Sequence, residues 1–230
     1  MLGPEVVTRR LSKTLRVRSL LLNRIEYALM NNPVRAVLQR LFEARRLLRM
    51  GGAMAGGRAL EVGCGRGVGT ELILQLFGAD TVDAFDLDPR MVEQARKRLS
   101  RYGARTRVWV GDVCAIDAPD ATYDAVFDFG IIHHVSQWRR ALAEVHRVIK
   151  PGGRIYAEEV LEQFIYHPAA RRLLDHPMED RFDAAAFALE LERTGFHSIV
   201  TEELWGQFGW FVARRKGLPK QPRAIGGADD

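Results

Sequence analysis

Residues 59–69 read ALEVGCGRGVG, an apolar run that leads into a glycine-rich turn and then into the start of a helix. Glycine permits positive φ angles and lets the backbone approach a ligand closely. The dinucleotide pattern G-x-G-x-x-G fails, because the third residue after Gly65 is Val68 and the third after Gly67 is Thr70. No Gly-Lys-Ser/Thr follows, so the phosphate-loop pattern fails as well. The turn therefore indicates a ligand-binding loop of another class.

Short apolar runs alternate with helical patterns after this turn, as in βαβ units with right-handed crossovers. Strands are predicted at Ala59–Val62, Val82–Asp86, Arg107–Val110, Ala125–Phe129, Arg154–Glu158, His197–Leu204 and Phe208–Arg214. Helices are predicted at Gly69–Phe77, Pro89–Ser100, Trp138–Ile149 and Asp183–Thr194. The sequence thus predicts a doubly wound, Rossmann-like α/β fold with a seven-stranded, mostly parallel sheet.

The two ends of the chain differ from this alternating part. Between Lys13 and Met50 the leucines recur at helical spacing, with a break at Asn31-Asn32-Pro33, which predicts two helices. We expect residues 1–52 to form N-terminal helices of the same domain, as a lid or docking element, and residues 53–216 to form the main domain. Residues 217–230 are rich in Pro, Gly and charge, which predicts a flexible tail.

The charge and the cysteine content of the chain limit the partners and the cellular location that we expect. The 230 residues carry a formal charge of +5, and residues 1–50 hold 11 Lys and Arg against 3 Asp and Glu. This basic arm either meets phosphate, an anionic membrane or an acidic substrate, or is a solvated helix face. The two cysteines, Cys64 and Cys114, form no zinc site, and we expect no metal. No bilayer-spanning run or signal peptide is recognised, so a reducing, cytoplasmic location is expected.

Three motifs lie in order on three predicted strand ends. The first is Glu61-x-Gly63-x-Gly65-x-Gly67, the second is residues 85–91 (FDLDPRM), and the third is residues 110–113 (VGDV). Together they resemble the class I S-adenosylmethionine-dependent methyltransferases. Residues 123–135 and 141–153 resemble the small-molecule, type 11-like branch of that superfamily, and the whole resemblance covers roughly residues 57–160.

The resemblance implies S-adenosylmethionine as cofactor and S-adenosylhomocysteine as product. The glycine-rich loop would wrap the methionine portion, Asp86 would accept the ribose hydroxyls, and Asp112 with the backbone amide of Val113 would meet the adenine. Met91 either covers the adenine or packs in the core, and Asp88 is the expected cap of a helix that begins at Pro89. The cofactor-binding residues implied are Glu61, Gly63, Cys64, Gly65, Gly67, Asp86, Leu87, Met91, Asp112, Val113 and Asp128.

A general base is needed only if the methyl acceptor arrives protonated. Among the candidates at the carboxyl ends of the strands, His134 is the best placed for proton transfer near neutral pH, or else it is a helix-start histidine bonded to backbone. Glu159 is expected to be a solvated carboxylate. The other candidates are Asp128, His133 and Glu158, whereas His167 and His176 lie in the irregular stretch 159–182 and are assigned no role. Five aromatic residues either line an acceptor pocket or pack in the core, namely Phe164, Tyr166, Trp205, Phe208 and Trp210.

The sequence therefore predicts a methyltransferase that acts on a small molecule, with the acceptor atom (O, N, S or C) undetermined. The segment Phe127-Asp128-Phe129-Gly130 is not the Asn-Pro-Pro-Tyr tetrapeptide of base-modifying relatives, so a nucleic-acid substrate is not expected. Two alternatives remain: a non-catalytic cofactor-binding or regulatory protein of this fold, and a lipid or quinone methyltransferase at a membrane surface, which the basic helices would contact. A nicotinamide-dependent oxidoreductase is disfavoured by the glycine spacing.

Overall fold

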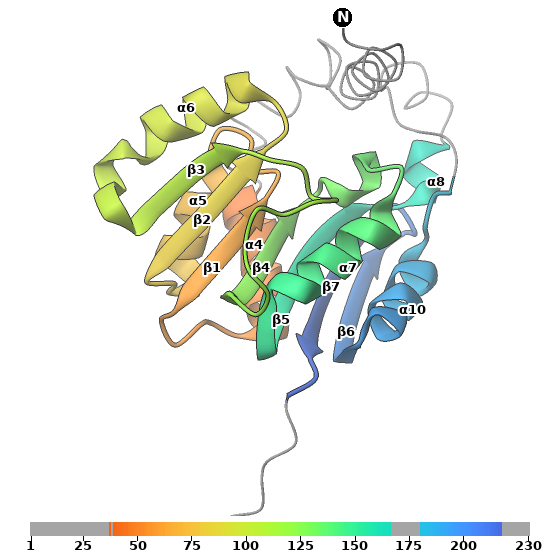
Figure 1. The fold of residues 1–230 in the computed structure, drawn as a ribbon. Helices are drawn as coiled ribbons and strands as arrows, with labels where there is room; N and C mark the ends of the chain where they lie inside the picture. The colour runs from red at the N-terminus through yellow and green to blue at the C-terminus, as the bar shows by residue number, and fades with distance from the viewer. Residues whose placement is uncertain (1–36, 38, 167–179, 218–230) are drawn as a thin grey trace, which may run out of the picture.

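The computed structural model describes residues 37, 39–166 and 180–217. Within them, seven strands form one sheet in the order β3-β2-β1-β4-β5-β7-β6 (Figure 1). The strands are β1 Arg58–Val62, β2 Thr81–Asp86, β3 Thr106–Val110, β4 Tyr123–Phe129, β5 Ile149–Val160, β6 Phe196–Leu204 and β7 Phe208–Arg215. Neighbours from β3 to β5 pair in parallel, whereas β7 runs antiparallel to both β5 and β6. The predicted seven-stranded, mostly parallel sheet is confirmed.

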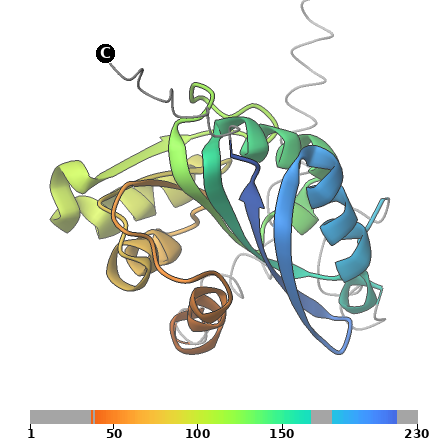
Figure 2. The ribbon, with the colours of Figure 1, turned by 90° about the horizontal axis from the view of Figure 1, so that it is seen from below.

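Helices cover both faces of this sheet, as Figure 2 shows for α4 on one side and α10 on the other. The helical elements are η1 Gln39–Glu43, α4 Ala44–Gly51, α5 Val68–Leu72, η2 Ile73–Phe77, α6 Pro89–Leu99, η3 Ser100–Arg105, η4 Ile132–His134, α7 Trp138–Val148, α8 Glu162–Ile165 and α10 Ala184–Thr194. One core forms under α4 and η2, where Leu47 and Phe77 meet Phe127. The other forms under α7 and α10 around Trp138 and Phe187.

The strand order reverses between β1 and β4, since β2 and β3 follow on one side of β1 and β5 lies on the far side of β4. In open parallel sheets, ligands bind outside the carboxyl ends of the strands at this switch point. The glycine-rich turn follows β1 directly, and Asp128 lies near the end of β4. The fold therefore brings the predicted cofactor residues to one edge of the sheet.

Local sequence signals set most helix ends. Asp88 caps α6, because its side chain accepts a hydrogen bond from the Arg90 amide and Pro89 occupies the first turn. Asp183 caps α10 in the same way, and Gly195 ends that helix with a φ of 109°. Two predictions need correction. The helix expected over 69–77 changes from α-helix to a π-helical turn at Ile73, and β5 begins at Ile149 rather than at Arg154.

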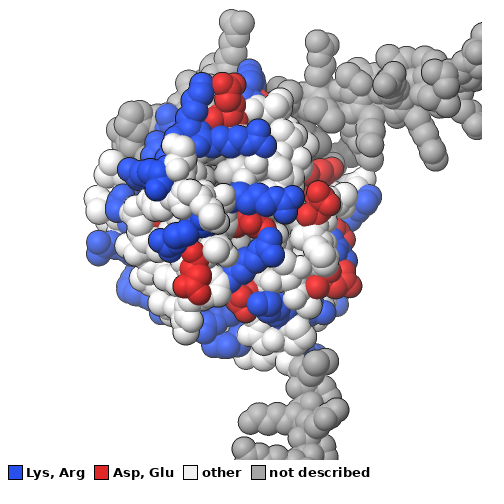
Figure 3. Space-filling view, turned by 60° about the vertical axis from the view of Figure 1, so that its left-hand side comes forward, with Lys and Arg blue, Asp and Glu red and all other residues white. Residues whose placement is uncertain are grey.

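Figure 3 shows Lys and Arg side chains gathered with few acidic ones on the part of the surface formed by α6 and its surroundings. A hollow of about 450 Å³ on this side is lined by Arg66, Glu71, Gln94, Lys97, Arg98 and Arg101. The carboxylate of Glu71 pairs with both Arg98 and Arg101. Basic charge is therefore not confined to the N-terminal arm, although part of it is neutralised within the fold.

Most of the predicted N-terminal helical segment, up to residue 36, and the tail from residue 218 lie outside the described residues. What the structure describes of the second helix, η1 and α4, packs against β7 and β5, with the Arg46 guanidinium 4.0 Å above the Trp210 ring centroid and bonded to Glu202. None of the described helices combines the length and the hydropathy needed to cross a bilayer.

Candidate functional site

The glycine-rich turn takes a conformation that requires its glycines. Gly63, Gly65 and Gly67 have φ angles of 66°, 51° and 80°, a region that costs other residues about 1–2 kcal/mol. A Cβ atom at Gly63 would lie 2.5 Å from the Ile131 side chain, so this glycine lets the segment after β4 approach the turn. A Cβ at Gly65 would meet no atom within 4 Å. The Gly65 position is thus open on the side where a side chain would project.

Asp86, at the end of β2, holds this turn in place. Its Oδ2 accepts a hydrogen bond of 2.9 Å from the Gly65 amide, and its Oδ1 accepts one of 2.9 Å from the Asp88 amide. Burial raises the pKa of Asp86 from its usual value, against the lowering effect of these bonds. Each carboxylate oxygen has a second lone pair, so Asp86 retains capacity to accept further hydrogen bonds.

Glu61 lies beneath the turn rather than in an open cleft. Its carboxylate is buried and accepts a hydrogen bond from the Thr70 hydroxyl. A Cβ at Gly69 would overlap this carboxylate, so the first turn of α5 needs glycine there. Burial, with smaller contributions from Asp86 and Asp128, raises the pKa of Glu61 to about 8 against the lowering effect of the Thr70 hydrogen bonds. The sequence offered no signal for the Thr70 contact.

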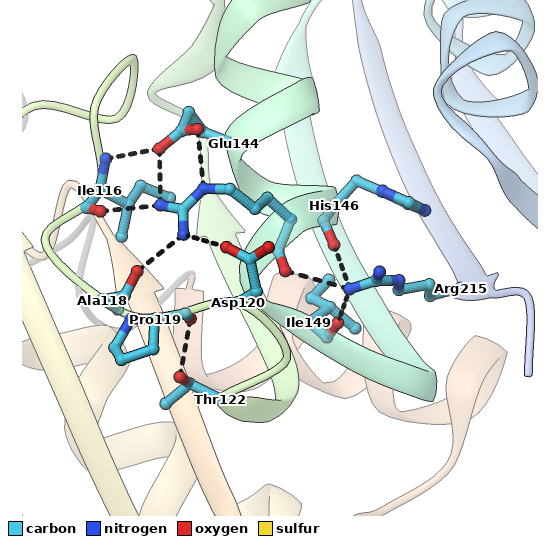
Figure 4. Close-up of polar contacts among 10 residues, drawn as sticks. Ile116, Ala118, Pro119, Asp120, Thr122, Glu144, His146, Ile149 and Arg215 are labelled. Atoms are coloured by element: carbon cyan, nitrogen blue, oxygen red, sulfur yellow. Dashed lines mark hydrogen bonds and ion pairs between the residues drawn. The ribbon is translucent and has the colours of Figure 1, made fainter. Parts of the chain in front are cut away.

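The third predicted element follows β3. Asp112 uses Oδ1 to accept a hydrogen bond of 2.8 Å from the Cys114 amide, which closes a tight turn, and Val113 is buried. The next residues are tied to α7, since the Ile116 amide donates to Glu144 Oε2 at 2.9 Å (Figure 4). This anchoring fixes the turn that carries Asp112.

Arg147 also holds the chain that connects β3 to β4. Its guanidinium bonds to Glu144, to Asp120 and to the carbonyl oxygens of Ile116 and Ala118, over distances of 2.8–2.9 Å. These bonds use both ends of its planar fork and raise its pKa. Glu144 and Arg147 pair with each other along α7. The structure shows that they also hold the chain that connects β3 to β4.

A buried acidic network lies across the ends of β4 and β5. Glu159 is 1% exposed and accepts hydrogen bonds from the Ile132 and His133 amides at 2.9 and 3.1 Å, while His133 Nδ1 lies 2.6 Å from its Oε2. The expectation of a solvated Glu159 is therefore wrong. Asp128, fully buried, bonds to the Ile131 amide through Oδ1 and to the carboxyl group of Glu159.

Two carboxyl groups in contact need a proton between them. Burial and the charge of Glu159 raise the pKa of Asp128 well above its usual range, which favours the protonated form of Asp128. Burial likewise raises the pKa of Glu159 to about 7. Asp128 is thus a poor candidate for a base at neutral pH, and Glu159 is engaged with the backbone.

His134 lies in η4 beside His133, with ring centroids 4.1 Å apart, and its amide donates to the Ile131 carbonyl. His134 is only half-buried, whereas His133 and Glu158 are buried. His134 is thus the more accessible histidine of the pair, as a base would need to be, and its role stays a prediction. His167 and His176 lie outside the described residues.

The five aromatic candidates do not form one pocket wall. Trp210 is buried in the core under α4, while Trp205 is 79% exposed at the turn between β6 and β7. Phe164 and Phe208 pack against each other with ring centroids 5.4 Å apart, and Tyr166 is 44% exposed. Core packing thus accounts for Trp210, and Trp205 and Tyr166 are available to a ligand or partner.

The residues present fit a cationic nucleoside cofactor. The turn offers an open glycine position, and the charge of Asp86 contributes to the raised pKa of Glu61, a repulsion that a sulfonium or an ammonium group would relieve. Leu87 is half-buried and Met91 buried, both just after β2. Burial also raises the pKa of the Cys64 thiol within the turn, which makes it unreactive. No group of metal ligands occurs in the described part of the chain.

Known proteins share this arrangement. A family model described as a methyltransferase domain matches residues 59–153. A demethylmenaquinone methyltransferase of Tropheryma whipplei is 30% identical over 196 residues, which cover 75% of this chain and 80% of the relative. A fatty-acid O-methyltransferase of Mycolicibacterium smegmatis is 30% identical over 124 residues, 54% of this chain and 44% of the relative.

Among solved structures, an S-adenosylmethionine-dependent methyltransferase from Aquifex aeolicus superposes with a TM-score of 0.64 at 23% identity, covering 82% of this chain and 96% of that one. Its likeness confirms the fold, and the demethylmenaquinone methyltransferase shares both sequence and length with this chain. The chain belongs to the class I S-adenosylmethionine-dependent methyltransferases and is an enzyme of that family.

Proposed function

We propose that this enzyme methylates a small molecule, with the cofactor held at the carboxyl ends of β1, β2, β3 and β4. The observation that carries the proposal is the convergence of three features at one edge: the open glycine turn, the Asp86 carboxylate and the anchored Asp112 turn. In this proposal Asp86 accepts the ribose hydroxyls, Asp112 and the Val113 amide meet the adenine, and Leu87 and Met91 border the ring.

The cofactor supplies a methyl group on a positively charged sulfur, which leaves as a neutral thioether. The chain therefore has to bind and orient the two partners rather than create a strong nucleophile. Holding reacting atoms in line near contact is worth roughly 7–11 kcal/mol. The Asp128–Glu159–His133 network fixes η4 against β5, and η4 presents His134 at the same edge. If the acceptor is an alcohol or a phenol, His134 takes its proton.

Relatives support a small acceptor. The similar proteins include, by their names, a methyltransferase of demethylmenaquinone and one of fatty acids. These acceptors share an apolar body and one oxygen-bearing end, which suits an edge where Trp205 and Tyr166 are exposed beside polar groups. We infer an acceptor of this amphiphilic class, with the atom that receives the methyl group left open.

Calorimetric titration with S-adenosylhomocysteine, with NAD as a parallel control, tests the cofactor assignment. Binding of the first alone is expected. A panel of phenols, fatty acids, amines and thiols, followed by transfer of a labelled methyl group, then tests the acceptor class. Failure of S-adenosylhomocysteine to bind folded, ligand-free protein would contradict the assignment, and labelling of a macromolecule alone in a cell extract would contradict the small acceptor.

A second candidate is methylation of a lipid or quinone at a membrane surface. Its specific support is that η1 exposes apolar side chains next to a basic one. Phe42 is 65% exposed and Leu41 is 48% exposed, and both follow Arg40 directly in the sequence. Such a combination binds anionic membrane surfaces. Flotation of the full chain with anionic vesicles at low salt is expected to recover the protein, and Phe42→Ser should reduce that recovery. Absence of binding would remove this candidate.

A further inference from the structure

Arg181 lies two residues before Asp183, the cap of α10, and the backbone on either side of it is fixed by hydrogen bonds. The carbonyl oxygen of Asp180 accepts a hydrogen bond of 2.9 Å from Trp138 Nε1, and that of Phe182 accepts one of 3.1 Å from the Glu162 amide. Its own Nη1 donates to the carbonyl oxygen of His133 in η4. The guanidinium is therefore fixed against the segment that follows β4.

The other edge of this guanidinium is buried and lacks a partner among the described residues. Nε and Nη2 of Arg181 have no solvent exposure and no hydrogen-bond partner among the residues that the structure describes. A buried donor left unsatisfied costs about 1–3 kcal/mol, and more when it is charged. Burial also lowers the pKa of Arg181, although Tyr166, Asp180 and Glu159 act against this.

The nearby carboxylates are already engaged. Asp180 pairs with Arg139, and Glu159 is bonded to the amides of η4 and to the ring of His133. Neither carboxylate accepts a hydrogen bond from Nε or Nη2 of Arg181. The Nε–H and Nη2–H groups of Arg181 are therefore two coplanar donors to which the described residues offer no oxygen acceptor.

The Nε and Nη2 atoms of Arg181 lie at the same end of the strands as the cofactor turn. Nη1 of Arg181 contacts His133, and Ile131, two residues earlier, lies where a Cβ at Gly63 would collide with it. Segment 131–133 therefore touches the cofactor turn on one side and Arg181 on the other. A group bound to Arg181 would therefore lie next to the segment that contacts the cofactor turn, within reach of a molecule that extends toward the cofactor.

We propose that the Nε and Nη2 edge of Arg181 binds a carboxylate of the methyl acceptor and so selects acids as substrates. Two parallel N–H groups match the two oxygens of a carboxylate, and such charge-assisted pairs are short and directional. The nearby carboxyl groups of Asp180 and Glu159 disfavour a doubly charged phosphate here. This inference rests on the proposed small-molecule function and identifies one recognition group of the acceptor.

The test uses the full chain saturated with S-adenosylhomocysteine, whose binding is measured first. Failure at that first step would contradict the proposed function itself. The probes are octanoate with octanamide, benzoate with benzamide, and octyl phosphate. We expect at least one acid to bind the wild type tenfold or more tightly than its amide. No binding of either acid, equal binding of acid and amide, or preference for octyl phosphate would overturn the proposal.

Variants then assign the preference to Arg181. Arg181→Gln is expected to lose the acid-over-amide preference while keeping the affinity for S-adenosylhomocysteine within threefold. Arg181→Lys keeps the charge without the planar fork and should retain only part of the preference, so it remains informative if the Gln variant does not fold. Arg193→Gln removes the same charge from an exposed position of α10 and should behave as the wild type. An unchanged preference in both Arg181 variants would overturn the assignment.

Discussion

Nδ1 of His133 lies 2.6 Å from Oε2 of Glu159, inside a network in which both side chains are almost fully buried. The same carboxylate accepts the amides of Ile132 and His133, so one side chain of β5 satisfies three donors of the segment that follows β4. Because buried donors without partners are costly, this carboxylate determines the path of η4. The position of His134 and of Arg181's partner carbonyl depends on it.

Glu159→Ala should lower the free energy of unfolding by at least about 2 kcal/mol, because two buried amides and an imidazole lose their acceptor. Chemical denaturation near pH 7 measures this change. Glu162→Ala, a less buried carboxylate three residues later at the start of α8, is the matched control and should change stability by less than about 0.5 kcal/mol. Equal effects of the two substitutions would show that Glu159 is not a structural anchor.

Glu61→Gln should make the free energy of unfolding of the cofactor-free protein fall less steeply as the pH rises. The pKa of Glu61 is raised from 4.5 to about 8 in the folded state. Below about pH 4.5 both states hold the proton. Between that pH and about pH 8 the unfolded chain releases it while the folded one keeps it, so the free energy of unfolding falls by at most about 1.4 kcal/mol per pH unit.

Gln cannot ionise, yet its carbonyl oxygen can still accept the Thr70 hydroxyl, so the variant lacks this contribution. The measurement is the free energy of unfolding of both proteins at several pH values from 5 to 8.5. The difference between them should grow with pH in favour of the variant. Parallel curves for the two proteins would mean that Glu61 is ionised in the fold at neutral pH.

Gly65→Ala should abolish or strongly weaken binding of S-adenosylhomocysteine, because its Cβ would occupy the open side of the cofactor turn. The φ of 51° adds a backbone cost of about 1–2 kcal/mol. Gly152→Ala is a matched control: Gly152 also has positive φ and open space, but it lies near the start of β5, at the opposite end of the strand from the site. Both variants should lose similar stability, measured by thermal unfolding.

Only the Gly65 variant should lose affinity in the calorimetric titration. If Gly65→Ala binds as tightly as Gly152→Ala does, the ligand does not approach this face of the turn. If both lose affinity, the effect arises from backbone strain transmitted through the fold rather than from occupation of the site.

The sequence allowed the sheet, its helices and their caps to be predicted, because these depend on neighbouring residues. The Asp88-Pro89 start of α6 and the Gly195 end of α10 are of this kind. The burial of Glu159 could not be predicted, since its partners lie 26 and 27 residues earlier and only the pairing of β4 with β5 brings them together. Arg181 carries no motif, and its open edge is apparent only from the contacts around it.

Asp86→Asn and Asp86→Ala separate two roles of this residue. In the structure Asp86 holds the Gly65 and Asp88 amides, and in the proposed complex it also accepts the ribose hydroxyls. Charged hydrogen bonds of this kind contribute about 1.5–3 kcal/mol, so Asp86→Ala should weaken S-adenosylhomocysteine roughly tenfold to more than a hundredfold. Asp86→Asn keeps one acceptor oxygen and should lose less.

The control for these variants is Asp88→Ala, which removes a helix cap in the same loop and should cost about 0.5–2 kcal/mol of stability with little change in affinity. Calorimetry and thermal unfolding on all three proteins distinguish the two roles. Because Asp86 is half-buried and supports the turn, a loss of stability alone is no evidence for ribose binding. An unchanged dissociation constant in folded Asp86→Ala would refute the ribose assignment, and it would move the adenosine site away from the end of β2.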